Sequence, residues 1–593
     1  MREVKIKVNA KEYRYWKVVE SYRDRKTKKN RHKTIINLRC LTEQQVKQIK
    51  ALLAMKTLGP DSFVTTLKEI EVGESYEFLN IVVLDRLFRM WELDKAIKNT
   101  GKASLVPLSV MTEILTLNRA LSPNSDYKVS NWYQTTMLPK MLEVIPALVN
   151  PTRIYRSLDE TYLQEEKIQK HLAAKIPALD FDDLSLILYD ITSTYFEGYH
   201  CPIAKFGLSR DHRKDRPQVL LALAVTKKGF PFFWRVLSGE IHDSATVTET
   251  VNTLKERFKV GRVCLVMDKG MVNKDNLEKI EKDNLSYLVT IPKTSFRKLP
   301  SFPKEMLSSL AKRLETEMKK EEPDYQKIMS DFPYFTYHSK RAYFHSLEEK
   351  EENRRYVLCF NPEKFSEERK QREEKIASIN KRFNEWNQEL LKAKNTRDKE
   401  QTGKEIFAYL EKRKAQGLFT TKVITKEIRR KNNTLFTIYQ IKWQINTAKL
   451  NLLKLTDGCY CLKTNLPKEI DPAFLVSSYR QRREVEVAFS YLKGFVEIRP
   501  LYHHKEDRVK AHITICILAY LLQVTCEHLL QKAGFNLSFQ EFLSRIAQRR
   551  AVDVNIANTG KQTCKLPEIP KEMMPLLNAL KINRAEITGI KPA

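Results

Sequence analysis

The chain has 593 residues, of which 104 are Lys or Arg and 73 are Asp or Glu, so its formal net charge is +31. With 42% apolar residues it can bury real cores in roughly four domains, which excludes global disorder. Only 16 glycines are present, and neither a P-loop nor a G-x-G-x-x-G motif occurs, which argues against a nucleotide-binding loop.

The cellular setting follows from the cysteines and the apolar stretches. Nine cysteines are scattered without a C-x-x-C pair, as is typical of reduced thiols in a cytosolic protein. No signal peptide is readable, and the apolar stretch at 511–522 is too short and too polar for a membrane helix. We therefore expect a cytoplasmic protein with no membrane partner, and the positive charge favours a polyanion such as nucleic acid.

Residues 1–180 are expected to form an N-terminal DNA-binding region. Alternating apolar and polar residues around the basic run Arg23–Lys33 predict a small β-hairpin with a basic tip, and helical periodicity follows from Thr42. A domain that only packs against the rest of the chain is the alternative for this region.

Over residues 181–292 the pattern changes from helical periodicity to short β-rich runs. It predicts the first part of an α/β core. Strands are expected at 184–189, 219–225, 230–236, 262–267 and 286–291, with helices at 244–258 and 273–282. This order predicts a mixed sheet flanked by helices, an α+β arrangement.

Residues 293–456 are expected to be an insertion of strands and charged helices, the latter mostly at 363–412. Residues 457–525 return to the core and contain a long helix that begins near Asp471. The remainder, 526–593, is expected to be helical and to contact either a partner or DNA.

The long helix presents four chemically active side chains on one stripe. Tyr479, Arg482, Glu486 and Lys493 fall within about 60° of one another on a helical wheel at ~100° per residue. Glu484 falls on another side, so it is a poor ligand candidate. A surface ladder of ion pairs would give the same pattern.

Two aspartates at strand ends favour a functional reading of that stripe. Asp190 and Asp268 each follow an apolar run, where an unpaired charge is costly. Together with Glu486 they supply three oxygen ligands suited to two Mg²⁺ or Mn²⁺ ions, which can act on a phosphodiester. Asp182 and Asp183 are expected to be solvated at the entry of their strand.

The motifs in order resemble those of a known family. The runs Tyr189–Glu197, Gly207–Val219, Met267–Met271, Tyr479–Phe489 and Arg499–His503 resemble the DDE transposases of bacterial insertion sequences, in the insertion-sequence-four group marked by a Y-R-E-K helix. The resemblance covers about residues 184–292 and 457–525. It implies an RNase H-like core with Asp190, Asp268 and Glu486 as the catalytic and metal-binding triad.

The resemblance also implies the reaction and the partners. It implies cut-and-paste transposition by a homodimer on double-stranded DNA, at terminal inverted repeats and at a target. Two alternatives stay open, namely a nuclease of the same core without strand transfer and a repurposed DNA-binding protein without catalysis.

Further residues are expected to contact DNA. Basic clusters at 210–216 and 480–483 flank the triad. The DNA-binding candidates are Tyr479, Arg482, Arg483, Lys493, Arg210, Arg216 and Lys269. The resemblance also implies a tryptophan that stacks on a flipped base, for which Trp443 is the candidate, with packing in a core as its alternative. His503 and His504 could contact phosphate or simply be exposed.

Overall fold

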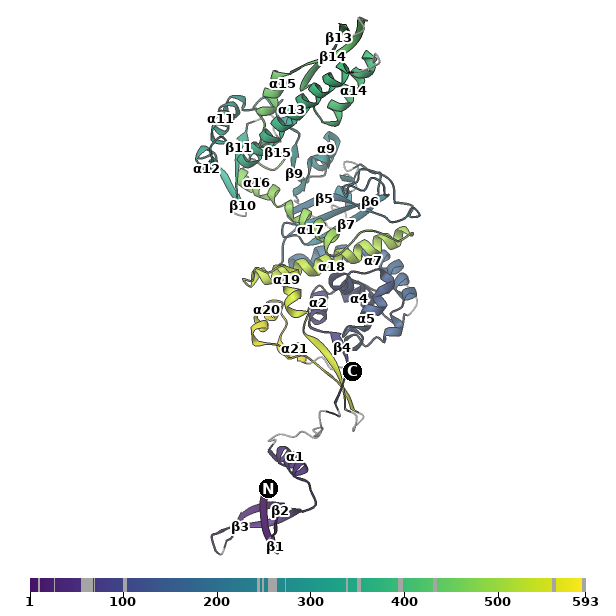
Figure 1. The fold of residues 1–593 in the computed structure, drawn as a ribbon, viewed down its shortest axis with the longest axis vertical. Coiled ribbons are helices and arrows are strands. Elements are labelled where there is room, and N and C mark those ends of the chain that lie inside the picture. The colour runs from purple at the N-terminus through teal and green to yellow at the C-terminus, as the bar shows by residue number, and fades with distance from the viewer. Residues whose placement is uncertain are drawn as a thin grey trace. The chain divides into compact units, whose positions relative to one another are not determined.

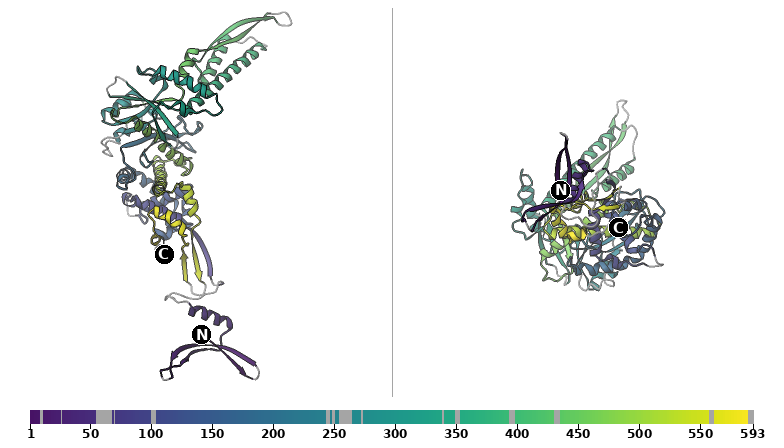
Figure 2. Two further views of the ribbon diagram at one scale, coloured as in Figure 1. Left: turned by 90° about the vertical axis from the view of Figure 1, so that its left-hand side faces the viewer. Right: turned by 90° about the horizontal axis from the view of Figure 1, so that it is seen from below.

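The computed structural model describes the chain except for residues 9–10, 26, 55–67, 69, 100–103, 243–245, 248–249, 254–263, 272, 338–339, 349–352, 393–397, 430–434, 557–560 and 589–593. The chain forms two compact units, one of Met1–Tyr76 with Ala551–Pro567 and one of Glu77–Arg550 with Glu568–Ala593. Each unit is described by itself (Figures 1 and 2). The helix expected at 244–258 falls largely outside the described residues.

The first unit contains two small antiparallel sheets. Strands β1 (Arg2–Val8), β2 (Lys11–Arg23) and β3 (Asn30–Leu38) form one sheet, followed by helix α1 (Glu43–Ala54). The turn between β2 and β3 is the expected basic tip, but a third strand extends the expected hairpin. Strands β4 (Ile70–Glu77), β16 (Arg550–Ile556) and β17 (Lys561–Lys565) form the other sheet, so the region expected to be helical at the C-terminus contains two strands.

The second unit begins with a helical layer, as the periodicity predicts. Its helices are α2 (Leu79–Met90), α3 (Leu93–Ala96), α4 (Leu108–Leu121), α5 (Val129–Gln134), α6 (Leu138–Met141) and α7 (Pro151–Ala178), with short 3₁₀ turns at Asp126–Lys128 and Pro146–Leu148. Asn150 caps α7 by accepting a hydrogen bond from the backbone N–H of Arg153.

The predicted mixed sheet is present. Strands β5 (Leu186–Tyr195), β6 (Gln218–Thr226) and β7 (Pro231–Ser238) are antiparallel neighbours, while β8 (Cys264–Met267) and β9 (Ser286–Ile291) run parallel to β5. Gly229 has φ +86° in the turn between β6 and β7, a conformation that glycine adopts without strain. Helix α9 (Lys274–Lys282) connects β8 to β9.

The expected insertion does not form a separate body along its whole length. Strands β10 (Tyr334–Tyr337), β11 (Lys340–Leu347), β12 (Arg355–Phe360) and β15 (Cys459–Thr464) extend the same sheet, in the order β10-β11-β12-β15-β9-β8-β5-β6-β7. Helices α10 (Lys293–Phe296), α11 (Lys304–Glu317) and α12 (Tyr325–Ile328) belong to this part of the chain. The sheet therefore has nine strands among the described residues.

A smaller lobe projects from this sheet. Helices α13 (Pro362–Leu391) and α14 (Lys399–Lys412) lie beside the two-stranded sheet of β13 (Phe419–Arg429) and β14 (Leu435–Ile445), and α15 (Thr447–Lys454) follows (Figure 2). The charged helices bury one apolar stripe, which includes Ile379 and Phe383, against the hairpin. They are thus less solvated than the sequence predicts.

The last helices close the core. After α16 (Pro472–Arg480) and α17 (Arg483–Gly494), the long α18 (Glu506–Lys532) packs on α7, α4 and β7, and α19 (Phe539–Ile546), α20 (Met574–Ala579) and α21 (Arg584–Thr588) follow (Figure 1). By length and composition α18 could cross a membrane, so the expectation that its apolar stretch is too short was wrong. Its apolar window is 83% buried inside the protein, as in a core helix.

Candidate active site

Asp190 and Asp268 lie at the same level of two neighbouring parallel strands. The register pairs Leu188 of β5 with Val266 of β8, so Asp190 and Asp268 are each two residues further along. Both carboxylates are half-buried. The apolar runs before them fill the sheet interior, and this places both aspartates where β8 ends.

Glu486 lies in the first turn of α17, and α17 packs on β5 and β6. The predicted single helix is in fact two, because α16 ends at Arg480 and α17 begins at Arg483. The backbone between them tightens into i to i+3 hydrogen bonds, from Glu484 N–H to the Gln481 carbonyl and from Val485 N–H to the Arg482 carbonyl.

Arg482 lies between two of the three predicted carboxylates. Its guanidinium is 3.4 Å from Oδ2 of Asp190 and 2.5 Å from Oε1 of Glu486. The Asp190 side chain is 19% exposed, whereas that of Glu486 is 51% exposed. The break between the helices therefore positions a cation that joins a buried acid on the sheet to an accessible acid on the helix.

Burial dominates the electrostatics of Asp190. Loss of solvent raises the pKa of Asp190 to about 6, although the backbone N–H of Ile191, at 2.8 Å, and the charge of Arg482 act in the opposite direction. The neighbouring Asp268 adds to the increase. A buried carboxylate whose charge is costly in this way is typical of a functional site.

A cleft of about 790 Å³ opens beside these groups. Asp268, Arg482 and Glu486 line it together with residues from β9, β11, α13 and β15. Its cationic lining residues are Lys293, Lys340, Lys364, Arg480, Arg482 and Arg483, against three acidic ones, Asp268, Glu368 and Glu486. Of these, Lys293, Lys340 and Lys364 were not predicted as site residues, because they lie on α10, β11 and α13, which meet the triad only in three dimensions.

Tyr479 and Arg483 also line the cleft. The Tyr479 hydroxyl is 3.2 Å from the hydroxyl of Thr290 on β9, and burial raises its pKa. Tyr479 thus fixes the end of α16 to the sheet, while Arg483 is exposed.

Lys493 pairs with a buried carboxylate at the far end of α17. Its Nζ is 2.8 Å from Oδ1 of Asp211, and its side chain is only 15% exposed. Arg499 pairs with the same carboxylate, whose side chain is 1% exposed. Asp211 is a residue that the sequence analysis missed, since the run around it reads as a basic cluster.

The other predicted DNA contacts lie in different settings. Arg216 pairs with Glu197 at 3.0 Å, and the backbone N–H of Arg210 donates to the Ser193 hydroxyl at 2.8 Å. The Lys269 side chain lies outside the described residues. Glu484 lines a separate cavity with Lys227 and Lys228, as its place on the helical wheel predicts.

The structure bears on two further expectations. Trp443 packs against Phe383 and donates to Asn380 at 2.9 Å, contacts that favour the core alternative. Asp182 is not solvated, because its side chain is 1% exposed and lies 3.5 Å from Lys227.

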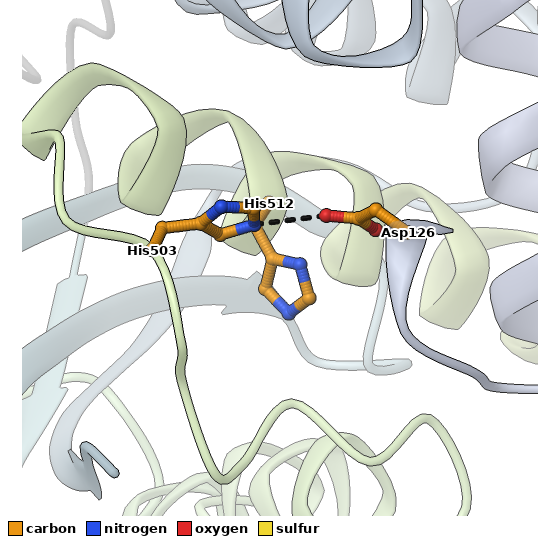
Figure 3. Close-up of side chains that lie close together, drawn as sticks. All are labelled: Asp126, His503 and His512. Atoms are coloured by element: carbon orange, nitrogen blue, oxygen red, sulfur yellow. Dashed lines mark ion pairs between the residues drawn. The ribbon is translucent and has the colours of Figure 1, made fainter. Parts of the chain in front are cut away.

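A second cluster joins the loop after α17 to the helical layer. Asp126, His503 and His512 are the only three described side chains of ligand type found with their ligand atoms within 4.8 Å of one another (Figure 3). Nε2 of His503 is 2.9 Å from Oδ2 of Asp126 and its side chain is 12% exposed, so His503 is not simply exposed. Arg119 is 3.4 Å from the same carboxylate, and its positive charge opposes binding of a metal cation there.

This cluster makes the stability of the protein depend on pH. Burial and the nearby Arg119 lower the pKa of His512 well below its usual range. Burial alone would raise the pKa of Asp126, but the hydrogen bond from His503 and the nearby charges hold it below its usual range. His512 is therefore neutral in the folded protein and charged in the unfolded chain below about pH 6.5.

Replacing His512 by Gln should make stability less sensitive to acid. Above about pH 6.5 the neutral histidine does not lower the free energy of unfolding. Below that pH the free energy of unfolding falls by about 1.4 kcal/mol for each pH unit, because only the unfolded chain binds the extra proton. Urea unfolding at pH 7.5 and 5.5 should show a smaller loss for His512→Gln than for the unaltered chain. The exposed His242→Gln is the control, and an equal loss in both variants would contradict the assignment.

Comparison with known proteins identifies the chain. Residues 185–522, more than half of the sequence, match the transposase DDE domain, and residues 1–60 match the N-terminal domain of IS1634 family transposases. The chain belongs to the DDE transposase family of bacterial insertion sequences. The predicted function is thereby confirmed, and the mixed sheet flanked by helices agrees with the predicted α+β fold class. The transposase belongs to a family of enzymes that act on DNA and generally use a divalent metal.

Two solved transposase structures resemble the chain only distantly. The transposase is 9% identical to a piggyBac transposase in a synaptic complex with hairpin DNA, over 87% of this chain and 85% of that one, with a TM-score of 0.33. It is 11% identical to the Mos1 transposase in a paired-end complex with the left transposon end, over 32% of this chain and 60% of that one, with a TM-score of 0.14. None of the curated proteins compared with the transposase matches it.

Proposed function

We propose that Asp190, Asp268 and Glu486 form the catalytic triad of this transposase and hold two Mg²⁺ or Mn²⁺ ions. The observation that carries the proposal is the shared level of Asp190 and Asp268 on adjacent strands, with Glu486 joined to Asp190 through Arg482. Two ions in such a site supply a Lewis acid for the attacking oxygen and another for the leaving oxygen.

The residues present fit such ions. All three donors are carboxylates, the ligands that Mg²⁺ and Mn²⁺ prefer. The Arg482 guanidinium provides positive charge between Asp190 and Glu486, where a cation between two carboxylates would lie. Arg482 thus supplies the positive charge that a metal ion would supply. Its movement away from Asp190 and Glu486 would leave both carboxylates able to bind metal.

The cleft beside the triad fits a phosphodiester backbone. The lysines and arginines that line it can neutralise phosphates, with Arg482 and Arg483 as two-pronged donors and Lys293, Lys340 and Lys364 as point charges. Bound DNA would pair with these cations while the scissile phosphate lies near Asp268 and Glu486. The net charge of the chain then makes binding strongly dependent on salt.

The substrates would be the terminal inverted repeats of the element and a target duplex. We propose strand cleavage followed by strand transfer, carried out by a homodimer bound to DNA in the cytoplasm at the nucleoid. The carboxylates would hold the metal ions, and the Tyr479 to Thr290 contact would keep α16 in place as DNA enters.

Replacing Glu486 by Gln should abolish Mg²⁺-dependent cleavage of a duplex that carries the element's end and leave DNA affinity nearly unchanged. Gln keeps the size of the side chain but removes the charge that a metal ion needs. Gel assays of cleaved and joined strands measure both steps, using a pre-cleaved end for joining.

The matched control is Glu484→Gln, which changes the same residue type in the same helical turn but on a wall of the other cavity. Cleavage should survive in that variant. Cleavage that persists in Glu486→Gln would refute the triad, and cleavage without any joined product would show a nuclease instead.

A further inference from the structure

The charge of the transposase is concentrated at its N-terminus. Residues 1–54 contain sixteen Lys and Arg against five Asp and Glu, a net charge of +11, which is about a third of the +31 of the whole chain. These residues form the sheet β1-β2-β3 and helix α1. A partner with high negative charge is therefore expected at this small sheet.

Helix α1 covers one face of the sheet. Trp16 pairs with Leu38 in the register, so both side chains point to the same face, and Leu38 and Val46 are buried. The Nζ of Lys50 on α1 lies 3.3 Å from the centre of the Trp16 ring. This face is used for packing within the unit.

The opposite face carries tyrosines and cations that remain accessible. Tyr13 and Tyr15 pair with Ile6 and Val4 of β1, and Tyr13 is 57% exposed. The Arg39 guanidinium lies 4.5 Å from the Tyr15 ring and donates to the Tyr15 hydroxyl at 3.2 Å. We call the surface formed by Tyr13, Tyr15, Lys17, Ser21, His32, Asn37 and Arg39 the open face.

Hydrogen-bonding side chains continue the open face along β2 and β3. Lys17 pairs with Asn37, and beyond the irregularity at Val18 and Val19 the alternation brings Ser21 and His32 to the same face, 2.9 Å apart. Side chains that donate or accept hydrogen bonds, mixed with cations, are what base edges and phosphates require.

The size of the sheet fits the major groove of B-DNA. Strands lie roughly 5 Å apart, so three strands span roughly 10 Å, while the groove is about 12 Å wide. The deep major groove of A-form RNA is too narrow for such an element. Double-stranded DNA is therefore the partner that charge and shape both favour, and strands are known to read DNA in this groove.

We propose that the open face, with Tyr13, Tyr15, Lys17 and Asn37, binds in the major groove at the ends of the element and supplies end recognition. Lys17 and Arg39 contact phosphates, and Asn37 and His32 face base edges. This inference rests on the proposed function, in which the chain acts on such ends.

The test compares two tyrosines on the same strand. Tyr13→Ala removes a ring from the open face, while Tyr22→Ala removes one from the other face, where Tyr22 is 47% exposed. The full chain is titrated, without divalent metal, against a 30-base-pair duplex of the DNA flanking the coding region and against a scrambled duplex. Tyr13→Ala should weaken end binding about tenfold or more and reduce the preference over the scrambled duplex, with Tyr22→Ala within about twofold of the unaltered chain.

Methylation interference identifies the groove. Methyl groups at guanine N7 in the major groove should block binding, while those at adenine N3 in the minor groove should not. Equal losses in both tyrosine variants, no loss in Tyr13→Ala, or interference from the minor groove alone would each overturn the inference.

These outcomes are separate from those that test the triad. Binding is measured without metal, so a chain that binds ends through the open face but never cleaves would refute only the proposed function. A chain whose Tyr13→Ala variant binds and cleaves ends normally would refute only this inference.

Discussion

Replacing Asp190 by Asn should abolish strand cleavage, by about 10³-fold or more, and should leave the metal-free protein at least as stable at pH 7.5. The charged form of this carboxylate is disfavoured, because burial raises the pKa of Asp190 to about 6. Relative to an unfolded pKa near 3.9, this corresponds to roughly 2–3 kcal/mol of cost at neutral pH, offset in part by loss of the Arg482 contact. Asn can still accept the hydrogen bond from Ile191.

The dependence on pH makes this prediction specific. Because the pKa of Asp190 is raised in the folded protein, its carboxyl does not lower the free energy of unfolding below about pH 4. The free energy of unfolding then decreases as the pH rises through about 6. The advantage of Asp190→Asn should therefore shrink toward zero as the pH falls to about 4, as measured by urea unfolding. A variant clearly less stable than the unaltered chain at pH 7.5 would show that Asp190 is a structural partner of Arg482.

Asp183→Asn is the control for the same substitution near the start of the same strand. Asp183 accepts from Ser185 and pairs with Lys227 at 2.9 Å, and these contacts lower its pKa to about 2. Its replacement should lower stability slightly and leave cleavage intact. Asp190→Asn should thus lose cleavage and keep its stability, whereas Asp183→Asn should keep cleavage and lose a little stability.

The sequence was sufficient to predict that Asp190 and Asp268 lie close together on the sheet. Asp190 and Asp268 follow apolar runs, which placed them on neighbouring parallel strands. Asp268 follows the end of β8 as predicted, whereas Asp190 lies in the middle of β5 because that strand continues to Tyr195. Local signals also placed the strands expected at 219–225 and 230–236, which correspond to β6 and β7 joined by the turn at Gly229. These features depend on strand patterning and turn chemistry, which are local.

The surroundings of these carboxylates depend on contacts that no local pattern encodes. The break before Arg483 turns the predicted straight stripe into a bridge from Arg482 to Asp190, across 292 residues of sequence. Lys493 meets Asp211 across 282 residues. A helical wheel fixes which side chains share a face, but not which partner the fold brings to that face.

The extent of the sheet was hidden for a similar reason. Strand β12 pairs with β15 about a hundred residues later, so the chain between them reads as an insertion although its flanking strands extend the central sheet. Trp443 shows the same limit, since only the packing of the hairpin on Phe383 decides between a core residue and a stacking residue. Such choices depend on tertiary packing.

Asp211→Asn should destabilise the second unit by about 3 kcal/mol or more. The Asp211 side chain is 1% exposed and pairs with both Lys493 and Arg499, which are 15% and 29% exposed. Removing one partner of a buried ion pair leaves the other charges uncompensated. Urea unfolding measures the loss, and Asp215→Asn, at an exposed site in the same loop, should change stability little.

A double-mutant cycle decides what Lys493 does. If the pair is structural, Lys493→Met in the Asp211→Asn background should recover part of the lost stability, because it removes a buried cation without a partner.

Burial lowers the pKa of Lys493 and the Asp211 carboxylate opposes this, so we propose that Lys493 holds Asp211 and the loop at Arg499 in place and does not bind phosphate. The salt dependence of DNA affinity should then be unchanged in Lys493→Met and should decrease by about one ion in Arg483→Met, whose exposed cation lines the cleft. A decrease in Lys493→Met instead would show that DNA draws Lys493 away from Asp211, and the buried carboxylate would then act as its resting partner.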